Sequence, residues 1–384
     1  MKKQLVAWDY ALKNNLLQRL TQGLFRPFDA PAVRRVLVGR VGALGDGLCA
    51  LPALRAIRAS FPQAQVHLLT RTGGWGRVSL GDLAGPDLVD EVLDFEDLAP
   101  LALLRRVRRG QYDLFIELPQ NHAGLGTLLR HVVWAKLAGF PHAFGWEIAV
   151  TRWFRRFQEA HRSFPDERSR LLALLRRHGL HVTADEAFPL AITPGDEAVV
   201  GRFFRENHLG EEEPPVALVV GAARPQNRWP VAHFAHVANW LLRRGYEVLV
   251  VGGADDRPLA ARLPRHPRLH DLTGRFTPRQ SAVVLRRCQC CVANDTGTMH
   301  LAYAVGTPVV ALFSARDYPG LWFPPLAGHH VFRTENVPCG VCLSARCTDN
   351  VCLKVISPGL VIDVLENLLT HPNVTPLSLR NAWC

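Results

Sequence analysis

Short apolar runs alternate with longer stretches in which apolar residues recur every three or four positions, and the alternation forms two blocks. In the first block, from position 36 to about 190, we expect strands at 36–39, 66–70, 91–95 and 112–118. Helices are expected at 48–60, 98–109 and 124–137. Strands that alternate with helices predict a mostly parallel sheet with helices on both faces.

The second block repeats this pattern. The expected strands are 216–221, 247–252, 290–293 and 308–313, and the expected helices are 231–244, 257–263, 278–287, 297–305 and 361–369. Turn-forming residues separate the blocks. We therefore expect an extension (1–33), a first domain (34–192), a linker region (193–215), a second domain (216–356) and a C-terminal helix and tail (357–384). A cleft between two such domains is a favoured place for a ligand.

The extension predicts an amphipathic helix, because apolar residues recur at three- and four-residue spacing. The members of this stripe are Leu5, Trp8, Leu12, Leu16 and Leu20. Lysine and arginine outnumber acidic residues here, which suits an interfacial helix on an anionic membrane. The helix could equally pack on the protein itself or on a neighbouring subunit, and packing on the protein is the interpretation we favour.

Composition places the chain among globular proteins. It has 384 residues, of which 48% are hydrophobic and 21% charged, enough for two full cores. We expect a cytoplasmic location, because no uncharged apolar run of spanning length and no signal peptide is apparent. The nine cysteines do not form the framework of a secreted protein.

The net charge of +11 favours an anionic acceptor, a membrane surface or a solvated basic face. No nucleic-acid module is recognisable, so we expect no nucleic-acid partner. The arginine-rich segment 152–180 predicts a helical pair with a solvated face.

The strongest candidate for a ligand site is the segment 294–302, Asn-Asp-Thr-Gly-Thr-Met-His-Leu-Ala. It predicts a strand, a tight turn and a helix. Thr296 and Gly297 would stand at the helix N-terminus, where unpaired N–H groups and the helix dipole favour an anion. Asp295 could accept hydrogen bonds from sugar hydroxyls. The alternative is an ordinary helix cap.

A similar element follows the first expected strand. The glycines of Gly42-Ala43-Leu44-Gly45-Asp46-Gly47 permit a sharp turn, although their spacing is not that of a dinucleotide fingerprint. Asp46 would lie at the carboxyl end of that strand, where open α/β sheets bind ligands. Here too a helix cap is the alternative.

Four segments in order resemble the ADP-heptose:lipopolysaccharide heptosyltransferases, glycosyltransferase family 9, some of which modify autotransporter proteins. They are Arg40–Ala53, Gly221–Pro230, Asp271–Gly274 and Asn294–Phe313. The resemblance implies an α/β fold of the GT-B class, with two Rossmann-like parallel-sheet domains facing a central cleft and a C-terminal helix that returns to the first domain. It also implies an ADP-heptose donor and inverting transfer without a catalytic metal or other cofactor.

The resemblance assigns roles to several residues. Asp46 would be the catalytic base, and Thr296 and Gly297 would hold the diphosphate. Thr273 and Gly274 would lie near the adenine. By analogy with acidic residues after a second strand, Asp256 suits a ribose diol, with a helix cap as the alternative.

Two further residues lie in the matching segments. His300 stands one turn into the phosphate-binding helix and is a candidate donor-binding residue, although a packed histidine is commoner there than a catalyst. Trp229 is most simply a core residue.

One position departs from the family. The lysine that usually stands two residues before the Trp-Pro pair is Asn227 here. We expect Arg228 or Arg224 to neutralise the leaving diphosphate instead, since guanidinium binds phosphate in bidentate geometry. The alternatives are an altered donor preference and a lost activity.

Cys339, Cys342, Cys347 and Cys352 are close enough in sequence for a tetrahedral zinc or iron site of structural type. Reduced thiols and disulfides are the alternatives. Similar clusters occur in heptosyltransferase relatives that modify autotransporter proteins and carry iron. Cys288, Cys290 and Cys291 flank or lie in an expected strand and suit a core.

Together these features predict a glycosyltransferase that uses an ADP-sugar and a lipopolysaccharide-core or related anionic glycan acceptor. Peripheral contact with the inner membrane and a homo-oligomer are compatible with the sequence. One rival is a heptosyltransferase that acts on autotransporter adhesins. The other is a non-catalytic nucleotide-binding or assembly protein of the same fold.

Overall fold

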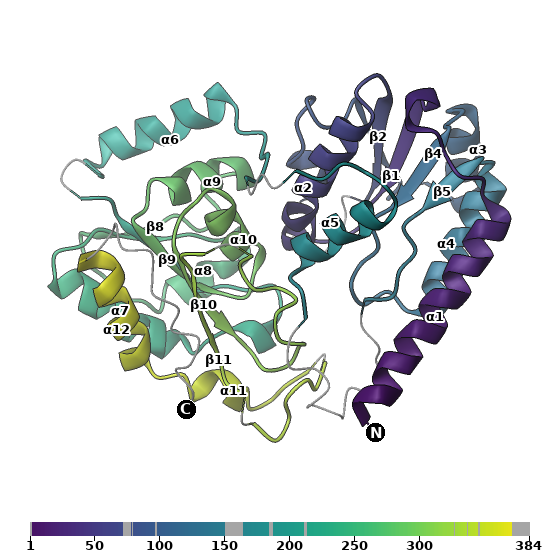
Figure 1. Ribbon diagram of the computed structural model, residues 1–384. Coiled ribbons are helices and arrows are strands. Elements are labelled where there is room, and N and C mark those ends of the chain that lie inside the picture. Colours follow the sequence, from purple (N-terminus) through teal and green to yellow (C-terminus); the bar gives the residue numbers. More distant parts are fainter. Residues whose placement is uncertain are drawn as a thin grey trace. The chain divides into compact units, whose positions relative to one another are not determined.

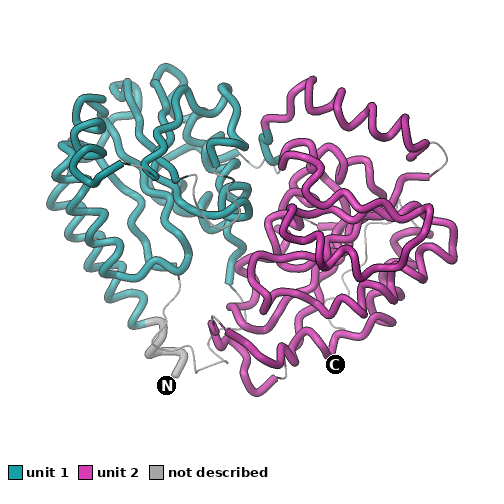
Figure 2. The backbone as a smooth tube through the Cα atoms, turned by 180° about the vertical axis from the view of Figure 1, so that it is seen from behind, with its two compact units in different colours: residues 1–190 teal, residues 191–384 magenta. Residues whose placement is uncertain are grey.

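The computed structural model describes residues 2–71, 78, 80–96, 98–149, 164–183, 187–210, 213–325, 327–335, 337–344 and 346–370. The side chains of residues 2–7 lie outside this description. The chain forms two compact units, Met1–Leu190 and Ala191–Cys384, which are coloured separately in Figure 2. Each unit is built around one parallel sheet.

The sheet of unit 1 has the strand order β3-β2-β1-β4-β5, and all its pairs are parallel. Its strands are β1 Arg35–Gly39, β2 Gln65–Thr70, β3 Glu91–Asp94, β4 Leu114–Glu117 and β5 His142–Phe144. Four of the five match expected strands. The sequence analysis missed β5, which has only three residues.

Unit 1 has helices on both faces of its sheet (Figure 1). They are α1 Lys2–Leu24, α2 Leu44–Ser60, α3 Pro100–Arg109, α4 Leu125–Ala138 and α5 Glu167–Arg177, with short 3-10 turns at Ala30–Ala32 and Leu80–Asp82. α2 packs with α5, whereas α1 and α3 both pack with α4. The core beneath α1, α3 and α4 includes Leu17, Phe115 and Trp146.

The sheet of unit 2 has the order β11-β10-β9-β6-β7-β8, again parallel throughout. Its strands are β6 Val216–Val219, β7 Val248–Val250, β8 Leu269–Asp271, β9 Cys290–Asn294, β10 Val309–Phe313 and β11 His330–Arg333. The short strands β8 and β11 were not expected. Cys290 and Cys291 are fully buried in β9 and Cys288 is buried beside it, as predicted.

The helices of unit 2 follow the predicted order. They are α6 Pro194–Glu206, α7 Val231–Arg243, α8 Arg257–Ala260, α9 Pro278–Arg286, α10 Gly297–Ala304, α11 Val351–Lys354 and α12 Pro358–Thr370, with 3-10 turns η4 Pro225–Asn227 and η5 Ala254–Asp256. The segment expected as a linker contains α6, which packs against α9. A capping box between Thr193 and Asp196 starts α6.

The C-terminal helix was expected to return to the first domain, and this part of the prediction is wrong. α12 packs against α7 and β10 of unit 2. The reason is its apolar face, since Val361, Leu365 and Leu369 are buried in the core of unit 2. Arg244 on the chain after α7 also forms an ion pair with Glu366 of α12.

The arginine-rich segment 152–180 differs from its predicted solvated face. Within its described part, α5 buries Glu167, Arg168 and Arg170. The expected first helix of the pair, before residue 164, lies outside the described residues. Of the helices that the structure describes, none combines the length and the apolar character required to cross a membrane.

Candidate functional site

The carboxyl ends of the central strands of unit 2 form one continuous edge of polar groups and glycines. Asn294 at the end of β9 donates through its amide to the carbonyls of Val220 and Gly221, which follow β6, at 2.8 and 3.4 Å. Gly274, after β8, donates its N–H to the carbonyl of Gly252, after β7, at 2.9 Å. Ligands in open α/β folds bind at this edge.

Helix α10 begins at this edge with Gly297, two residues after Asp295. Thr296 occupies the position before the helix in an extended conformation, but its side chain makes no capping hydrogen bond. The alternative that this threonine is an ordinary cap is therefore not supported. The first N–H groups of a helix have no intrahelical acceptor, so Gly297 and its successor present donors suited to an anion.

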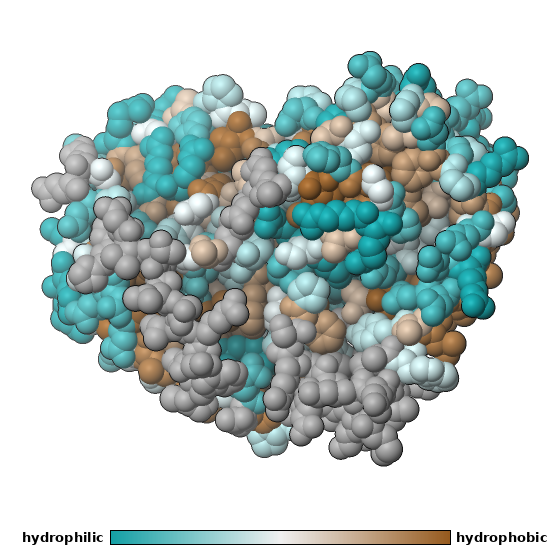
Figure 3. Space-filling view, viewed as in Figure 1, coloured by the Kyte–Doolittle hydropathy of each residue, from teal (hydrophilic) through white to brown (hydrophobic). Residues whose placement is uncertain are grey.

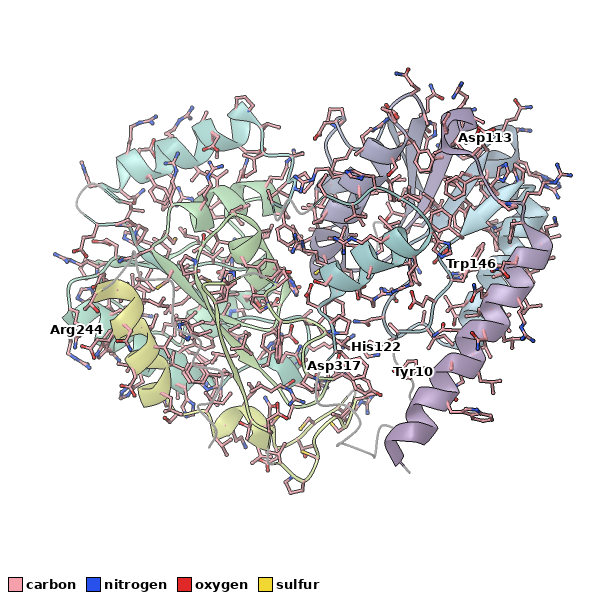
Figure 4. The ribbon with its side chains drawn as sticks, in the orientation of Figure 1. Tyr10, Asp113, His122, Trp146, Arg244 and Asp317 are labelled. Atoms are coloured by element: carbon pink, nitrogen blue, oxygen red, sulfur yellow. The ribbon has the colours of Figure 1, made fainter. Side chains whose placement is uncertain are left out.

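Asp295 is joined to the position that departs from the family pattern. The amide of Asn227 donates to Oδ2 of Asp295 at 2.8 Å, and Asn227 accepts a bond from the hydroxyl of Ser314 at 3.0 Å. Burial, helped by the neighbouring charge of Asp317, raises the pKa of Asp295 to about 7, against the opposing effect of Arg316 and Arg224. Asp317, labelled in Figure 4, follows β10. Asp295 is thus poised between its two charge states at neutral pH.

Asp256 lies against two glycines of the same edge. A Cβ on Gly221 would come within 1.9 Å of Oδ1 of Asp256, and one on Gly252 within 2.6 Å of Oδ2. Only glycine at both places leaves room for this carboxylate. Oδ2 accepts the N–H of Gly253 at 3.0 Å, so Asp256 also caps its own turn. Burial raises the pKa of Asp256 above its ordinary value.

Thr273 and Gly274 continue the edge beside Asp256. The Thr273 hydroxyl donates to Asp271 at 2.6 Å, and its carbonyl accepts from Arg257 at 3.1 Å. Gly274 has φ of +67°, and a Cβ there would lie 2.7 Å from Cα of Ala254. The backbone therefore requires glycine at this position. The structure brings Asp256, Thr273 and Gly274 together, as their assignment to one nucleoside predicts.

The two candidate arginines differ in their surroundings. Arg228 donates through Nε to the carbonyl of Ala222 at 2.8 Å, which fixes the base of its guanidinium. Its positive charge lowers the pKa of Asp256, against the larger effect of burial. Arg224 is exposed, and its charge acts on Asp295. Both cations therefore lie near the carboxylates of the edge.

Trp229 is a packed residue, as we expected, and His300, a candidate for donor binding, is packed as well. His300 is buried and hydrogen-bonds to the hydroxyl of Tyr303 at 2.6 Å. Burial lowers its pKa to about 3, so the imidazole is neutral. Trp229 is fully buried and donates through its indole N–H to the carbonyl of Ile356 at 3.0 Å.

Asp46, the candidate base, stands in the first turn of α2 in unit 1. The helix begins at Leu44, four residues before the expected start. Oδ2 accepts the N–H of Ala43 at 3.1 Å, so the helix-cap alternative is part of what this residue does. Oδ1 lies 3.4 Å from Nη2 of Arg40, and the Asp46 side chain is 19% exposed. The carboxylate is thus held in place yet open to solvent.

Behind Asp46 lies a buried ion network that the sequence analysis missed. Nη2 of Arg40 also binds Glu167 of α5 at 3.1 Å, and Glu167 binds Arg170 at 2.7 Å. Although burial by itself raises the pKa of Glu167, the two arginines hold it below its ordinary value. The only sequence signal was a Glu among arginines, which is usual on a solvated helix. Breaking such a buried network is strongly destabilising, so the network fixes Arg40 beneath Asp46.

The four clustered cysteines all border one cavity. Cys339, Cys342, Cys347 and Cys352 line this space together with Arg316 and other residues. All four are free thiols, and Cys352 is the buried member. Among the described residues, no group of three or more His, Cys, Asp or Glu side chains is arranged to hold a metal ion. The thiols converge on one space, but as they lie they do not fit a formed metal site, so the metal site stays a prediction.

Metal analysis tests this prediction directly. If the thiols bind zinc or iron, the protein purified without an affinity-metal step will contain about one equivalent, because four thiolates complete a tetrahedral site. Cys342→Ser should then lose the metal and lower the melting temperature, yet leave ADP binding intact. Cys288→Ser, outside the cluster, is the matched control for metal content. Less than about a tenth of an equivalent, with four titratable thiols in the cluster, would reduce these residues to ordinary cysteines.

Comparisons with known proteins agree with this geometry. The family model described as glycosyltransferase family 9 (heptosyltransferase) matches residues 101–351. The chain belongs to glycosyltransferase family 9. It is 25% identical to lipopolysaccharide heptosyltransferase 2 of Escherichia coli K12 over 320 residues. This alignment covers 76% of this chain and 86% of that protein. The protein is therefore a glycosyltransferase related to the lipopolysaccharide heptosyltransferases.

Solved structures share the fold. The structure of E. coli ADP-heptose lps heptosyltransferase II has a TM-score of 0.62 and 23% identity, over 89% of this chain and 100% of the other. The iron-containing dodecameric glycosyltransferase TibC from enterotoxigenic E. coli H10407 has a TM-score of 0.54 and 13% identity, over 89% of this chain and 77% of the other. The GT-B fold class predicted for this family member is confirmed.

Proposed function

We propose that this family 9 enzyme transfers a heptose from ADP-heptose to a lipopolysaccharide-core or related glycan, with inversion and without a catalytic metal. The observation that carries the proposal is the uncapped N-terminus of α10 at the carboxyl edge of the unit 2 sheet, beside Asp295. It offers N–H donors for a diphosphate and a carboxylate for sugar hydroxyls. The E. coli relative of the same fold is an ADP-heptose heptosyltransferase by its description.

The donor would lie along the edge of the sheet. In this proposal the diphosphate binds at Thr296 and Gly297, the ribose diol at Asp256, and the adenine near Thr273 and Gly274. The contacts between Asn294 and Gly221 and between Gly274 and Gly252 make this edge continuous. Asp295 binds heptose hydroxyls best, since an ionised carboxylate beside the diphosphate would repel it.

The reaction needs one proton transfer and one substitution. Asp46 takes the proton from the acceptor hydroxyl while that oxygen attacks the anomeric carbon. The bond between this carbon and the diphosphate oxygen breaks, and ADP leaves with the electron pair. Attack opposite to the leaving group inverts the anomeric configuration.

The residue at position 227 affects how the negative charge on the departing diphosphate is stabilised. Asn227 is neutral and its amide is engaged with Asp295. Arg228 or Arg224 should therefore stabilise the leaving group. Replacing the arginine that does so with alanine should lower kcat by about ten- to a hundred-fold, the effect of losing a charge-assisted hydrogen bond.

Two further variants make this test specific. Arg243→Ala, at the end of α7 away from the edge, is the control and should leave kcat unchanged. Asn227→Lys should be tolerated or activating, because an ammonium can donate to the Asp295 carboxylate as the amide does. Normal turnover in both Arg224→Ala and Arg228→Ala would show that neither arginine compensates for Asn227.

The pKa of Asp295 predicts a pH dependence of donor binding. Since this pKa is about 7 in the folded protein, the carboxyl is neutral below pH 7 and negative above it. ADP affinity should fall by about ten-fold as the pH rises through this range, because the new charge repels the diphosphate. Calorimetric titration with ADP between pH 6 and 8 measures this.

Comparison with Asp295→Asn removes the contribution of the nucleotide's own phosphate titration. The variant should bind ADP with a flatter pH profile than the native protein. Identical profiles would show that the charge of Asp295 does not act on the bound diphosphate.

Calorimetry with ADP, UDP and GDP, followed by turnover of ADP-heptose with candidate acceptors, tests the function as a whole. Tight binding of ADP alone and transfer to a lipopolysaccharide-core glycan are the expected results. Preference for UDP or GDP would break the donor inference. Transfer to a protein acceptor would favour the adhesin-directed rival. We also propose a cytoplasmic enzyme in peripheral contact with the inner membrane, where a lipid-linked acceptor would lie.

A further inference from the structure

Helix α1 exposes its apolar stripe. The helix packs on α4 through the face that carries the buried Leu17, and the amide of Asn14 bonds to the backbone of Ile148. Tyr10 lies on this inner side, as does Trp146, against which Phe25 stacks at 5.4 Å (Figure 4). Trp8, Leu12, Leu16 and Leu20 of the predicted stripe are exposed instead, and the side chain of Leu5 lies outside the described residues. The expectation that α1 packs on the protein is therefore confirmed. The contact is made by the other face of the helix, and not by the apolar stripe from which the packing was inferred.

The exposed fractions along the stripe fall steadily from the N-terminal end. They are Trp8 67%, Leu12 54%, Leu16 43%, Leu20 39% and Leu24 37%. These five residues are the apolar stripe. A step of four residues turns a helix by about 40° beyond a full turn, so the stripe rotates toward the protein body along its length. Trp8 and Leu12 therefore project furthest from unit 1.

The neighbouring helices extend this surface. α3 and α4 cover the same face of the sheet and expose Leu101, Val133 and Leu137. The sequences of α1, α3 and α4 contain ten Lys or Arg residues and a single acidic one, Asp9. Asp9 is paired with Lys13 at 2.6 Å. In Figure 3, brown hydrophobic atoms lie among teal ones on the side where α1 runs in Figure 1.

The basic charge of the face formed by α1, α3 and α4 indicates what kind of partner can bind it. A second copy docked face to face would place two strongly basic surfaces together, which is unfavourable. An anionic bilayer meets both properties at once, because its interface accepts apolar side chains and its headgroups attract lysine and arginine. Tryptophan is enriched at membrane–water interfaces, and Trp8 is the most exposed member of the stripe.

We propose that the α1–α3–α4 face docks on an anionic lipid surface, with the N-terminal half of α1 inserted into the headgroup region. Trp8 and Leu12 enter deepest, and the arginines of α3 contact the headgroups. The inference extends the membrane contact proposed above. It concerns binding to lipid alone, so its failure would leave the transferase function untouched.

The test is co-sedimentation of the full chain with vesicles, without donor or acceptor. Vesicles of phosphatidylcholine with phosphatidylglycerol should bind the protein, and vesicles of phosphatidylcholine alone should bind it far less. Trp8→Ser combined with Leu12→Asn should weaken binding by at least about ten-fold, because both side chains lose their burial in lipid. Leu24→Asn should have a smaller effect. Val199→Asn, on an exposed site of α6, is the control and should have none.

Each contrary outcome has a distinct meaning. Absence of binding to anionic vesicles, or equal binding to both kinds, overturns the proposal. So does an equal loss in Leu24→Asn and Trp8→Ser/Leu12→Asn, because the exposure gradient predicts unequal losses. Concentration-dependent dimerisation in solution that Leu12→Asn abolishes would instead assign the stripe to a second copy of the chain. The melting temperatures of the same variants check that they remain folded.

Discussion

Replacing Asp46 with asparagine should lower kcat by about two orders of magnitude or more and leave ADP binding almost unchanged. Asparagine keeps the size of the side chain and one oxygen, which can still accept the Ala43 N–H that Oδ2 of Asp46 accepts. Its amide nitrogen replaces the other oxygen, so the weaker contact with Arg40 at Oδ1 is lost. It removes the basicity that the acceptor hydroxyl requires. Steady-state kinetics with ADP-heptose, together with calorimetry with ADP, measure the two quantities separately.

The control for this variant is Asp87→Asn, an exposed aspartate of unit 1 that belongs to no proposed site. It should keep normal kcat. The melting temperature of Asp46→Asn should also be measured, because the carboxylate caps α2 and pairs with Arg40, whose other partner is the buried Glu167. Near-normal kcat in a stable Asp46→Asn protein would show that this residue is only a helix cap.

Replacing Gly297 with valine should weaken ADP binding by about a hundred-fold or more. Gly297 is the first residue of α10, where the helix presents its free N–H groups. A branched side chain there would hold the diphosphate away from these donors, and the loss of two charge-assisted hydrogen bonds accounts for the expected size. Calorimetric titration with ADP checks the affinity, and the melting temperature checks the fold.

Gly195→Val is a matched control, since Gly195 lies in the first turn of α6 with only the Thr193 hydroxyl near its Cβ position, at 3.6 Å. It introduces the same side chain at a helix N-terminus outside the proposed site. ADP affinity should be unchanged in this variant. Equal affinities in Gly297→Val and the native protein would show that the diphosphate does not bind at α10.

The sequence by itself determined the class of fold and named the segments of the proposed donor site. Two blocks of alternating strands and helices predicted two parallel sheets, because burial on both faces imposes continuous apolar strands. Glycines at 221, 252 and 274 mark positions at which a turn or a close approach excludes a side chain. Residues at the ends of parallel strands must meet at one edge, so Asp256 and Asp295 could be grouped without coordinates, whereas Gly274 was added only by the family resemblance, because the strand before it was not expected.

Only the tertiary structure decided which charged and apolar residues are buried. Glu167 and Arg170 are local neighbours in a sequence typical of a solvated helix, and their burial depends on Arg40, distant in the chain. The destination of α12 depends on which surface its apolar face covers, and the face itself does not specify it. In the same way, periodicity showed that α1 has an apolar stripe, but not that α4 would cover the opposite side. Amphipathicity is a local property of a helix, whereas burial requires a partner that folding brings from elsewhere in the chain.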